Sequence, residues 1–221
     1  RAGLERITVS LDALDDSAFR AVTDADYRVA DVLAGIDSAV QAGFAQLKIN
    51  CVVRRGLNED QILPLARHFH GSGHALRFIE YMDVGSTNGW RSEQVVSARE
   101  IVERIARELP LDPAPRALHS DVALRYRYRD GGGELGVIAS VTQPFCGDCT
   151  RLRLSADGQL FTCLFATNGH DVRARLRDGA TDAELLAFVH DLWQRRTDRY
   201  SEQRGALLMP RRKAEMSYLG G

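Results

Sequence analysis

Two hydrophobic patterns alternate along the first half of the chain. Apolar residues at every second position predict β-strands at residues 7–12 and 45–53, and a less regular alternation predicts a third strand at 74–83. Apolar residues recurring every three or four positions predict helices at 16–22, 29–44, 58–70 and 97–109. Strands that alternate with helices in this way are typical of an α/β fold with a parallel sheet and right-handed crossovers.

The first two predicted strands keep a polar face. Ser10 and Asp12 alternate with apolar residues in the first strand, and Lys48 and Asn50 do so in the second. An open parallel sheet covered on both faces would have almost uniformly apolar strands. A curved sheet whose interior carries a site explains the pattern better, so we predict a partial (β/α) barrel.

Lys48 has two interpretations on such a strand. It could be a salt-bridged residue whose ammonium group reaches solvent, or a cation inside the barrel that meets an anionic substrate. Burying an unpaired ammonium group is costly. We therefore favour the second interpretation and expect Lys48 to bind an anion.

Three predicted helices begin with the signature of a capping box, in which a side chain and a glutamate or glutamine three residues later satisfy free backbone N–H groups. The pairs are Asn58 with Gln61, Ser97 with Glu100, and Thr181 with Glu184.

The alternation stops at residues 111–115, which include two prolines. We predict a domain boundary there, dividing the chain into residues 1–110 and 111–221. Glycine-containing turns at 130–133 and 157–158 then predict two antiparallel hairpins. The second domain is expected to be a small α+β domain.

Three of the four cysteines lie in this second part. Cys146, Cys149 and Cys163 have the spacing C-x2-C-x13-C, and the hairpin at 157–158 would return the third towards the first two. Clustered thiolates bind zinc or an iron–sulfur cluster. The spacing alone leaves both open: zinc with a fourth ligand such as His170, or a 4Fe-4S cluster with one iron free. Cys51, on an apolar strand face, is expected in the core.

Arg151 and Arg153 alternate with Leu152 and Leu154 directly after the second cysteine. The arginines could form the solvated face of a strand. They could also present two guanidinium groups on one side, a geometry suited to phosphate oxygens.

Composition narrows the classes of function. The 221 residues include 29 basic and 30 acidic side chains, for a net charge of −1. No overall field would attract nucleic acid or a membrane, so neither is an expected partner. Four unevenly placed cysteines are typical of the reducing cytosol, and no signal peptide or membrane span is predicted. We expect a cytoplasmic protein and, because residue 1 is arginine, a piece of a longer chain.

Taken together, these residues resemble the GTP 3',8-cyclase family of radical S-adenosylmethionine enzymes, also called molybdenum cofactor biosynthesis protein A. The resemblance covers essentially the whole chain. The chain is similar to the C-terminal two thirds of the family's sequences. The matching stretches are 6–12, 47–50, 76–85, 143–154, 163–166, 198–201 and 218–221.

The resemblance implies a fold and a reaction. The family has an incomplete triosephosphate-isomerase-type barrel and a small C-terminal domain with an iron–sulfur cluster. One 4Fe-4S cluster, held by an N-terminal C-x3-C-x2-C, cleaves S-adenosylmethionine to a 5'-deoxyadenosyl radical, which takes the ribose 3' hydrogen of GTP. C3' then bonds to guanine C8, giving (8S)-3',8-cyclo-7,8-dihydroguanosine 5'-triphosphate.

The resemblance also implies roles for particular residues. It assigns Cys146, Cys149 and Cys163 to a second 4Fe-4S cluster whose open iron binds guanine. GTP would be bound by Lys48, Arg151, Leu152 and Arg153, with Arg77 a further candidate, and S-adenosylmethionine by Ser10 and Met82. The Gly220–Gly221 end would reach into the barrel. A homodimer, and the cyclic pyranopterin monophosphate synthase that takes up the product, are the expected protein partners.

The chain departs from the family pattern in one respect: it contains no C-x3-C-x2-C. The 221 residues alone are therefore expected to be inactive, whereas a full-length protein would be the cyclase. Two alternatives remain from the sequence: a zinc-stabilised nucleotide- or partner-binding module, and an iron–sulfur scaffold without turnover.

Overall fold

The computed structural model of the protein describes residues 3–116, 121–206 and 212–219. The chain forms two compact units. The first comprises residues 1–82 and 91–143, and the second comprises residues 83–90 and 144–221. The short loop after the third strand thus belongs to the same unit as the three clustered cysteines.

The first unit is built on a mixed, parallel-rich sheet in the order β1-β2-β3-β6-β5-β4. The first four strands in this order are parallel, and β5 and β4 are antiparallel to their neighbours. Their bounds are β1 Thr8–Ser10, β2 Lys48–Val53, β3 Ala75–Glu80, β4 Leu111–Ala114, β5 Leu124–Tyr128 and β6 Glu134–Ile138.

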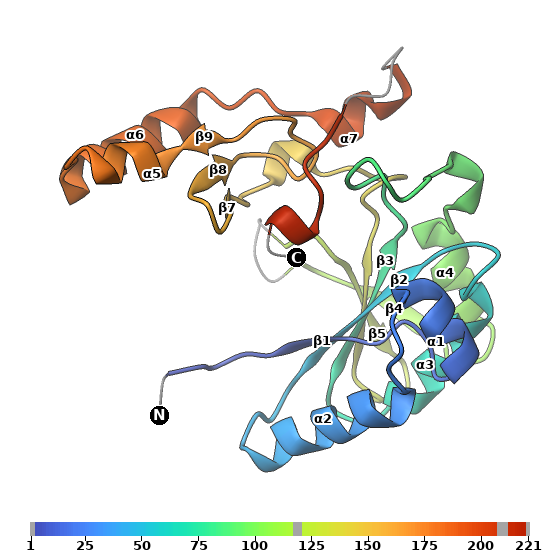
Figure 1. The fold of residues 1–221 in the computed structure, drawn as a ribbon. Helices are drawn as coiled ribbons and strands as arrows, with labels where there is room; N and C mark the ends of the chain where they lie inside the picture. Colours follow the sequence, from blue (N-terminus) through green and yellow to red (C-terminus); the bar gives the residue numbers. More distant parts are fainter. Residues whose placement is uncertain (1–2, 117–120, 207–211, 220–221) are drawn as a thin grey trace. The chain divides into compact units, whose positions relative to one another are not determined.

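Helices cover one face of this sheet. They are α1 Asp16–Thr23, α2 Val29–Gln41, α3 Ile62–Phe69 and α4 Ala98–Ala106, which Figure 1 shows gathered on the same side. Their apolar residues, such as Ile36, Leu65 and Ile101, form one core with Ile49 and Phe78 of the sheet. Successive right-handed crossovers that always advance in the same direction put every helix on the same face.

The other face carries the polar positions predicted from the alternation. In β2 and β3, buried residues alternate with half-buried ones, and Lys48, Asn50 and Arg77 belong to the half-buried set. Ser10, Asn50 and Arg77 are partners in the strand register and therefore form one row across β1, β2 and β3. The sequence pattern thus placed Ser10, Lys48 and Asn50 on the correct face. Asp12, expected beside them, instead lies beyond the end of β1 and is buried, and its carboxylate accepts a hydrogen bond from the N–H of Val52.

Residues 111–115 do not interrupt the sheet, contrary to the break expected there. Leu111–Ala114 form β4, which pairs with β5 at the edge of the sheet. Proline lacks an N–H group to donate but is tolerated on an edge strand. The predicted hairpin at 130–133 is formed by β5 and β6 and adds to the same sheet, so the compact units divide at 143/144.

The second unit contains a small antiparallel sheet in the order β7-β8-β9. β7 Arg153–Leu154 and β8 Gln159–Phe161 form the hairpin predicted at 157–158, where Gly158 has a φ of 84°. β9 is His170–Asp171, and the helices are α5 Val172–Arg177, α6 Asp182–Gln194 and α7 Tyr200–Gln203.

Few apolar side chains of the second unit are buried. Among its described residues, Leu160, Phe161, Phe165 and Leu219 are the buried hydrophobic ones, and α5 to α7 contain none. The first unit, in contrast, has a continuous core that runs from Leu11 to Ala139.

The predicted helix caps have two outcomes. The side chain of Ser97 accepts a hydrogen bond from the backbone N–H of Glu100, and Thr181 forms a full capping box with Glu184. The capping box of Asn58 was wrong. Asn58 is fully buried, donates to the backbone oxygens of Asp12 and Val52 and accepts from the N–H of Arg54.

Within the described part of the chain, no helix combines the length and the apolar character needed to cross a bilayer.

Candidate functional site: a thiol and arginine cluster

Two of the three clustered cysteines lie on one tight turn. Cys146, Gly147 and Asp148 form a short 3-10 helix, and the N–H of Cys149 donates to the oxygen of Cys146. All three thiols, including that of Cys163 after β8, are free and half-buried. The backbone N–H of Phe165 donates to Sγ of Cys163 at 3.5 Å. Such N–H···S hydrogen bonds stabilise thiolates that hold iron–sulfur clusters.

Both cysteine segments are anchored by residues that the sequence reasoning did not single out. Nη1 of Arg196 donates to the carbonyl oxygen of Cys149 at 2.8 Å. The hydroxyl of Thr162, the residue before Cys163, donates to Asp198 at 2.6 Å. Arg196 and Asp198 also form an ion pair with each other. The only sequence signal was that Asp198 begins one of the stretches that match the family.

Arg153 lies close to the thiols. Burial and then the charge of Arg151 hold the pKa of Arg153 below its ordinary value, against the opposite effects of Cys149 and Cys163. Burial raises the pKa of the Cys163 thiol, and proximity to Asp198 and Cys146 adds to the shift. The three cysteines and Arg153 therefore share one neighbourhood.

In the segment that follows the cysteine turn, the charged residues are more buried than the apolar ones. Arg151 and Arg153 are half-buried, whereas Leu152 and Leu154 are 36% and 61% exposed. Nη2 of Arg151 is buried without a hydrogen-bond partner, and the guanidinium lies over the ring of Phe145. No ion pair within the described residues joins Arg151 or Arg153 to a carboxylate. Unpaired guanidinium groups are costly to bury, so this arrangement favours an anionic ligand.

The thiols do not form a closed metal site. Among residues 3–116, 121–206 and 212–219, no three His, Cys, Asp or Glu side chains converge closely enough to hold a metal ion. His170 is exposed on β9 and does not complete such a group. The donor set nevertheless fits an anionic cluster, since soft thiols share this neighbourhood with an N–H···S hydrogen bond and two unpaired arginines.

A hollow of about 680 Å³ opens beside Cys163. Its lining includes Phe165, Asp198, Arg199 and Tyr200. Cys51, in contrast, is 1% exposed, and burial raises the pKa of its thiol well above the ordinary value, which confirms its expected place in the core.

The first unit carries a second group of cations, on the polar face of its sheet. The charge of Arg77, followed by partial burial and by Arg6, holds the pKa of Lys48 below its ordinary value. Burial also lowers the pKa of Arg77, and Asp121 opposes both shifts. Oδ1 of Asn50, in the same row as Arg77, is buried without a hydrogen-bond partner. This face thus combines concentrated positive charge with an unsatisfied polar atom.

The two residues assigned to S-adenosylmethionine also belong to the first unit. Ser10 is the last residue of β1 and is exposed, beside Asn50 in the register. Met82 is half-buried, two residues after the end of β3. Gly220 and Gly221 lie outside the described residues.

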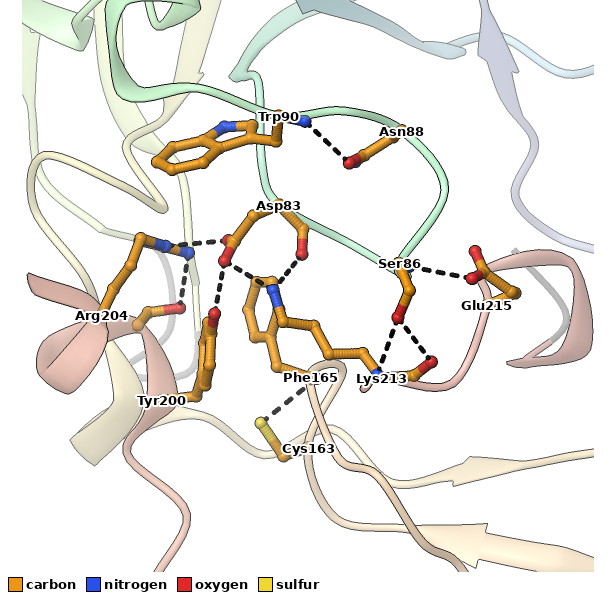
Figure 2. A network of polar contacts seen from close by, with 11 residues as sticks. Asp83, Ser86, Asn88, Trp90, Cys163, Phe165, Tyr200, Arg204, Lys213 and Glu215 are labelled. Carbon is orange, nitrogen blue, oxygen red and sulfur yellow. Dashed lines mark hydrogen bonds and ion pairs between the residues drawn. The ribbon is translucent and has the colours of Figure 1, made fainter. Parts of the chain in front are cut away.

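Directly after Met82, Asp83 is the centre of a polar network that the sequence reasoning missed (Figure 2). Its carboxylate accepts hydrogen bonds from Tyr200 at 2.5 Å, Arg204 at 2.8 Å and Lys213 at 2.6 Å. We call Asp83, Tyr200, Arg204 and Lys213 the Asp83 network. Asp83 and Tyr200 lie in stretches that match the family, but no local pattern indicates the network itself, because the partners of Asp83 lie more than a hundred positions away.

Comparison with known proteins agrees with this picture. The family model described as Molybdenum Cofactor Synthesis C matches residues 74–202. A GTP 3',8-cyclase of Acidothermus cellulolyticus is 50% identical over 245 residues, covering 100% of this chain and 68% of the relative. One from Xanthomonas campestris pv. campestris (strain 8004) is 51% identical over 221 residues, covering 100% and 65%. One from Parasynechococcus marenigrum is 50% identical over 231 residues, covering 100% and 66%.

The chain spans about two thirds of the length of these curated relatives. Half of all aligned positions are identical across the whole chain, and the family model covers the region from β3 to α7. The chain therefore belongs to the GTP 3',8-cyclase family.

Proposed function

We propose that the protein carrying this chain is a GTP 3',8-cyclase of molybdenum cofactor biosynthesis, and that this chain supplies most of its GTP-binding site. One observation carries the proposal: two half-buried, unpaired arginines lie beside three free thiols, while the alternating leucines Leu152 and Leu154 face solvent. A structural zinc turn would not require arginines to be half-buried and leucines to be exposed. A site that binds an anionic nucleotide next to a cluster would require the arginines to face inward.

Cys146, Cys149 and Cys163 would hold a 4Fe-4S cluster by three thiolates. When bound, this cluster supplies an open iron to which guanine can be ligated. The chain contributes the surroundings: Arg196 fixes the cysteine turn, Phe165 donates an N–H to one sulfur, and the arginines offset negative charge.

Arg151, Leu152 and Arg153 are the proposed GTP-contacting segment of the second unit. Guanidinium groups bind phosphate oxygens through paired hydrogen bonds, and the buried, unsatisfied Nη2 of Arg151 is a donor ready for one. Lys48, with Arg77 beside it, is the proposed GTP contact of the first unit. Mutual repulsion of these two cations is relieved when an anion binds between or beside them.

Ser10 and Met82 are the proposed contacts for S-adenosylmethionine. The parallel strands β1, β2, β3 and β6, with helices on one face and polar residues on the other, support a partial (β/α) barrel of the radical S-adenosylmethionine type. The radical-generating 4Fe-4S cluster would belong to a C-x3-C-x2-C outside this chain.

The remaining partners follow from the proposed activity. The cyclised nucleotide triphosphate would pass to cyclic pyranopterin monophosphate synthase. A cytoplasmic homodimer is the proposed state of the enzyme.

Metal analysis tests the cluster assignment. After anaerobic reconstitution of the whole protein, the Cys146→Ala, Cys149→Ala and Cys163→Ala variants should each retain less iron and acid-labile sulfide than the wild type. Cys51→Ala is the matched control, since this thiol is buried in the other unit, and it should load normally. Stoichiometric zinc without sulfide would instead support the zinc-stabilised binding module.

GTP binding tests the arginines. Arg151→Ala and Arg153→Ala should each weaken GTP binding by about 1.5–3 kcal/mol, the usual contribution of a charge-assisted hydrogen bond. Arg127→Ala, an exposed arginine of β5, is the control and should leave the affinity unchanged. If all three variants bound GTP with the affinity of the wild type, Arg151 and Arg153 would have no role in binding GTP. Normal binding and cluster content without turnover in the whole protein would favour the scaffold.

A further inference from the structure

The last described segment of the chain, residues 212–219, is attached along the second unit at several points. We call it the C-terminal strap. Lys213 donates to Asp83, and Glu215 accepts hydrogen bonds from the backbone N–H of Ser86 and the hydroxyl of Thr87. Figure 2 shows Lys213 and Glu215 on the strap directed towards the 83–90 loop. The strap therefore closes this loop against the remainder of its unit.

Lys213 of the strap contacts both Asp83 and two aromatic rings. Its ammonium group is 2.6 Å from both Oδ2 and the backbone oxygen of Asp83, and its side chain is only 7% exposed. The same ammonium group lies 4.6 Å from the ring centroid of Tyr200 and 5.4 Å from that of Phe165. A desolvated cation over an aromatic face stabilises the position of the ring.

Phe165 connects this network to the cysteine cluster. Its ring stacks on Tyr200 with centroids 4.6 Å apart and an angle of 22° between the planes. Its backbone N–H is the donor to Sγ of Cys163 (Figure 2). The strap holds the neighbouring residues as well, because the N–H of Ala214 donates to the oxygen of Ala166, and Thr167 donates to the oxygen of Arg212.

We propose that Asp83 is a positioning residue for Cys163: it fixes Lys213 and Tyr200 around Phe165, and Phe165 in turn directs its N–H at the cysteine sulfur. The consequence for the cluster rests on the proposed function, while the consequence for the thiol itself does not. The loop that follows β3 and the end of the chain thereby control the environment of one cluster ligand. Within the described part of the second unit, no hydrogen bond or ion pair joins Asp83 directly to the three thiols or to Arg151 and Arg153.

The first test uses the reactivity of the thiol in the cluster-free whole protein. Asp83→Asn and Lys213→Met should raise the rate of Cys163 alkylation by iodoacetamide about fivefold or more, because the loosened segment opens more often. Cys146 in the same molecule is the internal reference. Lys213→Arg keeps the charge and should behave as wild type. Glu100→Gln, which removes a carboxylate that pairs with Arg55 and Arg104 in the other unit, is the matched control and should change nothing.

The second test uses the reconstituted protein. Hydrogen bonds to a ligating sulfur help to set the reduction potential of a cluster, and losing one makes reduction harder. Asp83→Asn and Lys213→Met should therefore shift the potential of the second cluster to more negative values. Lys213→Arg, which keeps the positive charge, should have the same reduction potential as the wild type.

The outcomes separate the two proposals. If the wild type binds no cluster, the proposed function fails, and the alkylation rates still decide the role of Asp83. If the wild type binds the cluster but both variants match it in alkylation rate and potential, Asp83 has no positioning role. Should Asp83→Asn fail to fold, Lys213→Met, which leaves Tyr200 and Arg204 on the carboxylate, decides the question in the same way.

Discussion

Arg77 on β3 lies directly opposite Gly136 on β6, and a Cβ atom at position 136 would come within 3.1 Å of Cγ of Arg77. The same Cβ would also lie 3.3 Å from Cβ of Ala123. The glycine thus leaves the space that the long side chain of Arg77 occupies on the polar face of the sheet. This space lets a half-buried cation lie beside Lys48.

Gly136→Ala should therefore displace Arg77 and weaken GTP binding by the whole protein. Crowding of this kind also costs about 1–3 kcal/mol of folding free energy. Calorimetric titration with GTP and urea denaturation would measure the two effects. Gly35→Ala in α2 is the control: its Cβ meets open space, so it should stabilise the helix by up to about 1 kcal/mol and leave GTP binding unchanged.

Glu80 is a second position where one residue organises several segments. It is fully buried at the end of β3, and its carboxylate accepts from the N–H of Ala98, both donor groups of Thr142 and the N–H of Val141, at 2.5–2.8 Å. Glu80→Gln places an amide N–H₂ group against two of these donors. We expect a loss of about 3 kcal/mol of unfolding free energy, measured by chemical denaturation.

Glu103→Gln provides the comparison for Glu80. Glu103 forms an exposed i,i+4 pair with Arg99 on α4, and such pairs contribute about 0.5 kcal/mol or less. Equal losses in the two variants would contradict the structural role assigned to Glu80.

Asp83 should give the stability of the second unit a particular pH dependence. Burial alone would raise the pKa of Asp83, but hydrogen bonds from Lys213 and Tyr200 and the charge of Arg204 outweigh it and hold the pKa below the ordinary 3.8. A carboxyl group whose pKa is lower in the folded state stabilises that state above its unfolded pKa. The contribution disappears as pH falls through the folded value.

Asp83→Asn should accordingly be less stable than the wild type by about 2 kcal/mol near neutral pH, as expected for a partly compensated buried ion pair. The difference should persist down to about pH 4 and shrink below it. Denaturation of both proteins at a series of pH values would measure this. A difference that grew on acidification would contradict the lowered pKa.

The substitution Asn58→Asp distinguishes a helix-capping role of Asn58 from its observed role as a buried hydrogen-bond donor. At a helix N-cap, Asp replaces Asn with little loss. At its observed position, a carboxylate would face the backbone oxygens of Asp12 and Val52 without donors, at a cost of about 3 kcal/mol. Ser97→Asp, at an actual N-cap, should be close to neutral in the same denaturation assay.

The sequence predicted those features that depend on local periodicity. The alternation in residues 45–53 was sufficient to place Lys48 and Asn50 opposite the core, and a turn containing Gly158 was sufficient to predict β7 and β8. Local side-chain chemistry also predicted the caps at Ser97 and Thr181. In each case the decisive interactions lie within a few residues of one another.

Predictions failed where a distant segment decided the outcome. Asn58 has the residue type of a cap, but its amide is used by Asp12, which is 46 positions away. Pro113 reads as a chain break, but β5 offers an edge where its missing N–H costs nothing. The partners of Asp83 come from the end of the chain, and no local sequence pattern predicts them.

The small number of buried apolar side chains in the second unit has a thermodynamic consequence. Burial of Leu160, Phe161, Phe165 and Leu219 offers little free energy to offset the chain entropy of so many ordered residues, and the in-turned arginines add repulsion. A cluster held by the three thiols, as proposed, would act as part of the folding core of this unit. Its occupancy should raise the melting temperature of the second unit, whereas the first unit, which holds none of these thiols, should melt independently of the cluster.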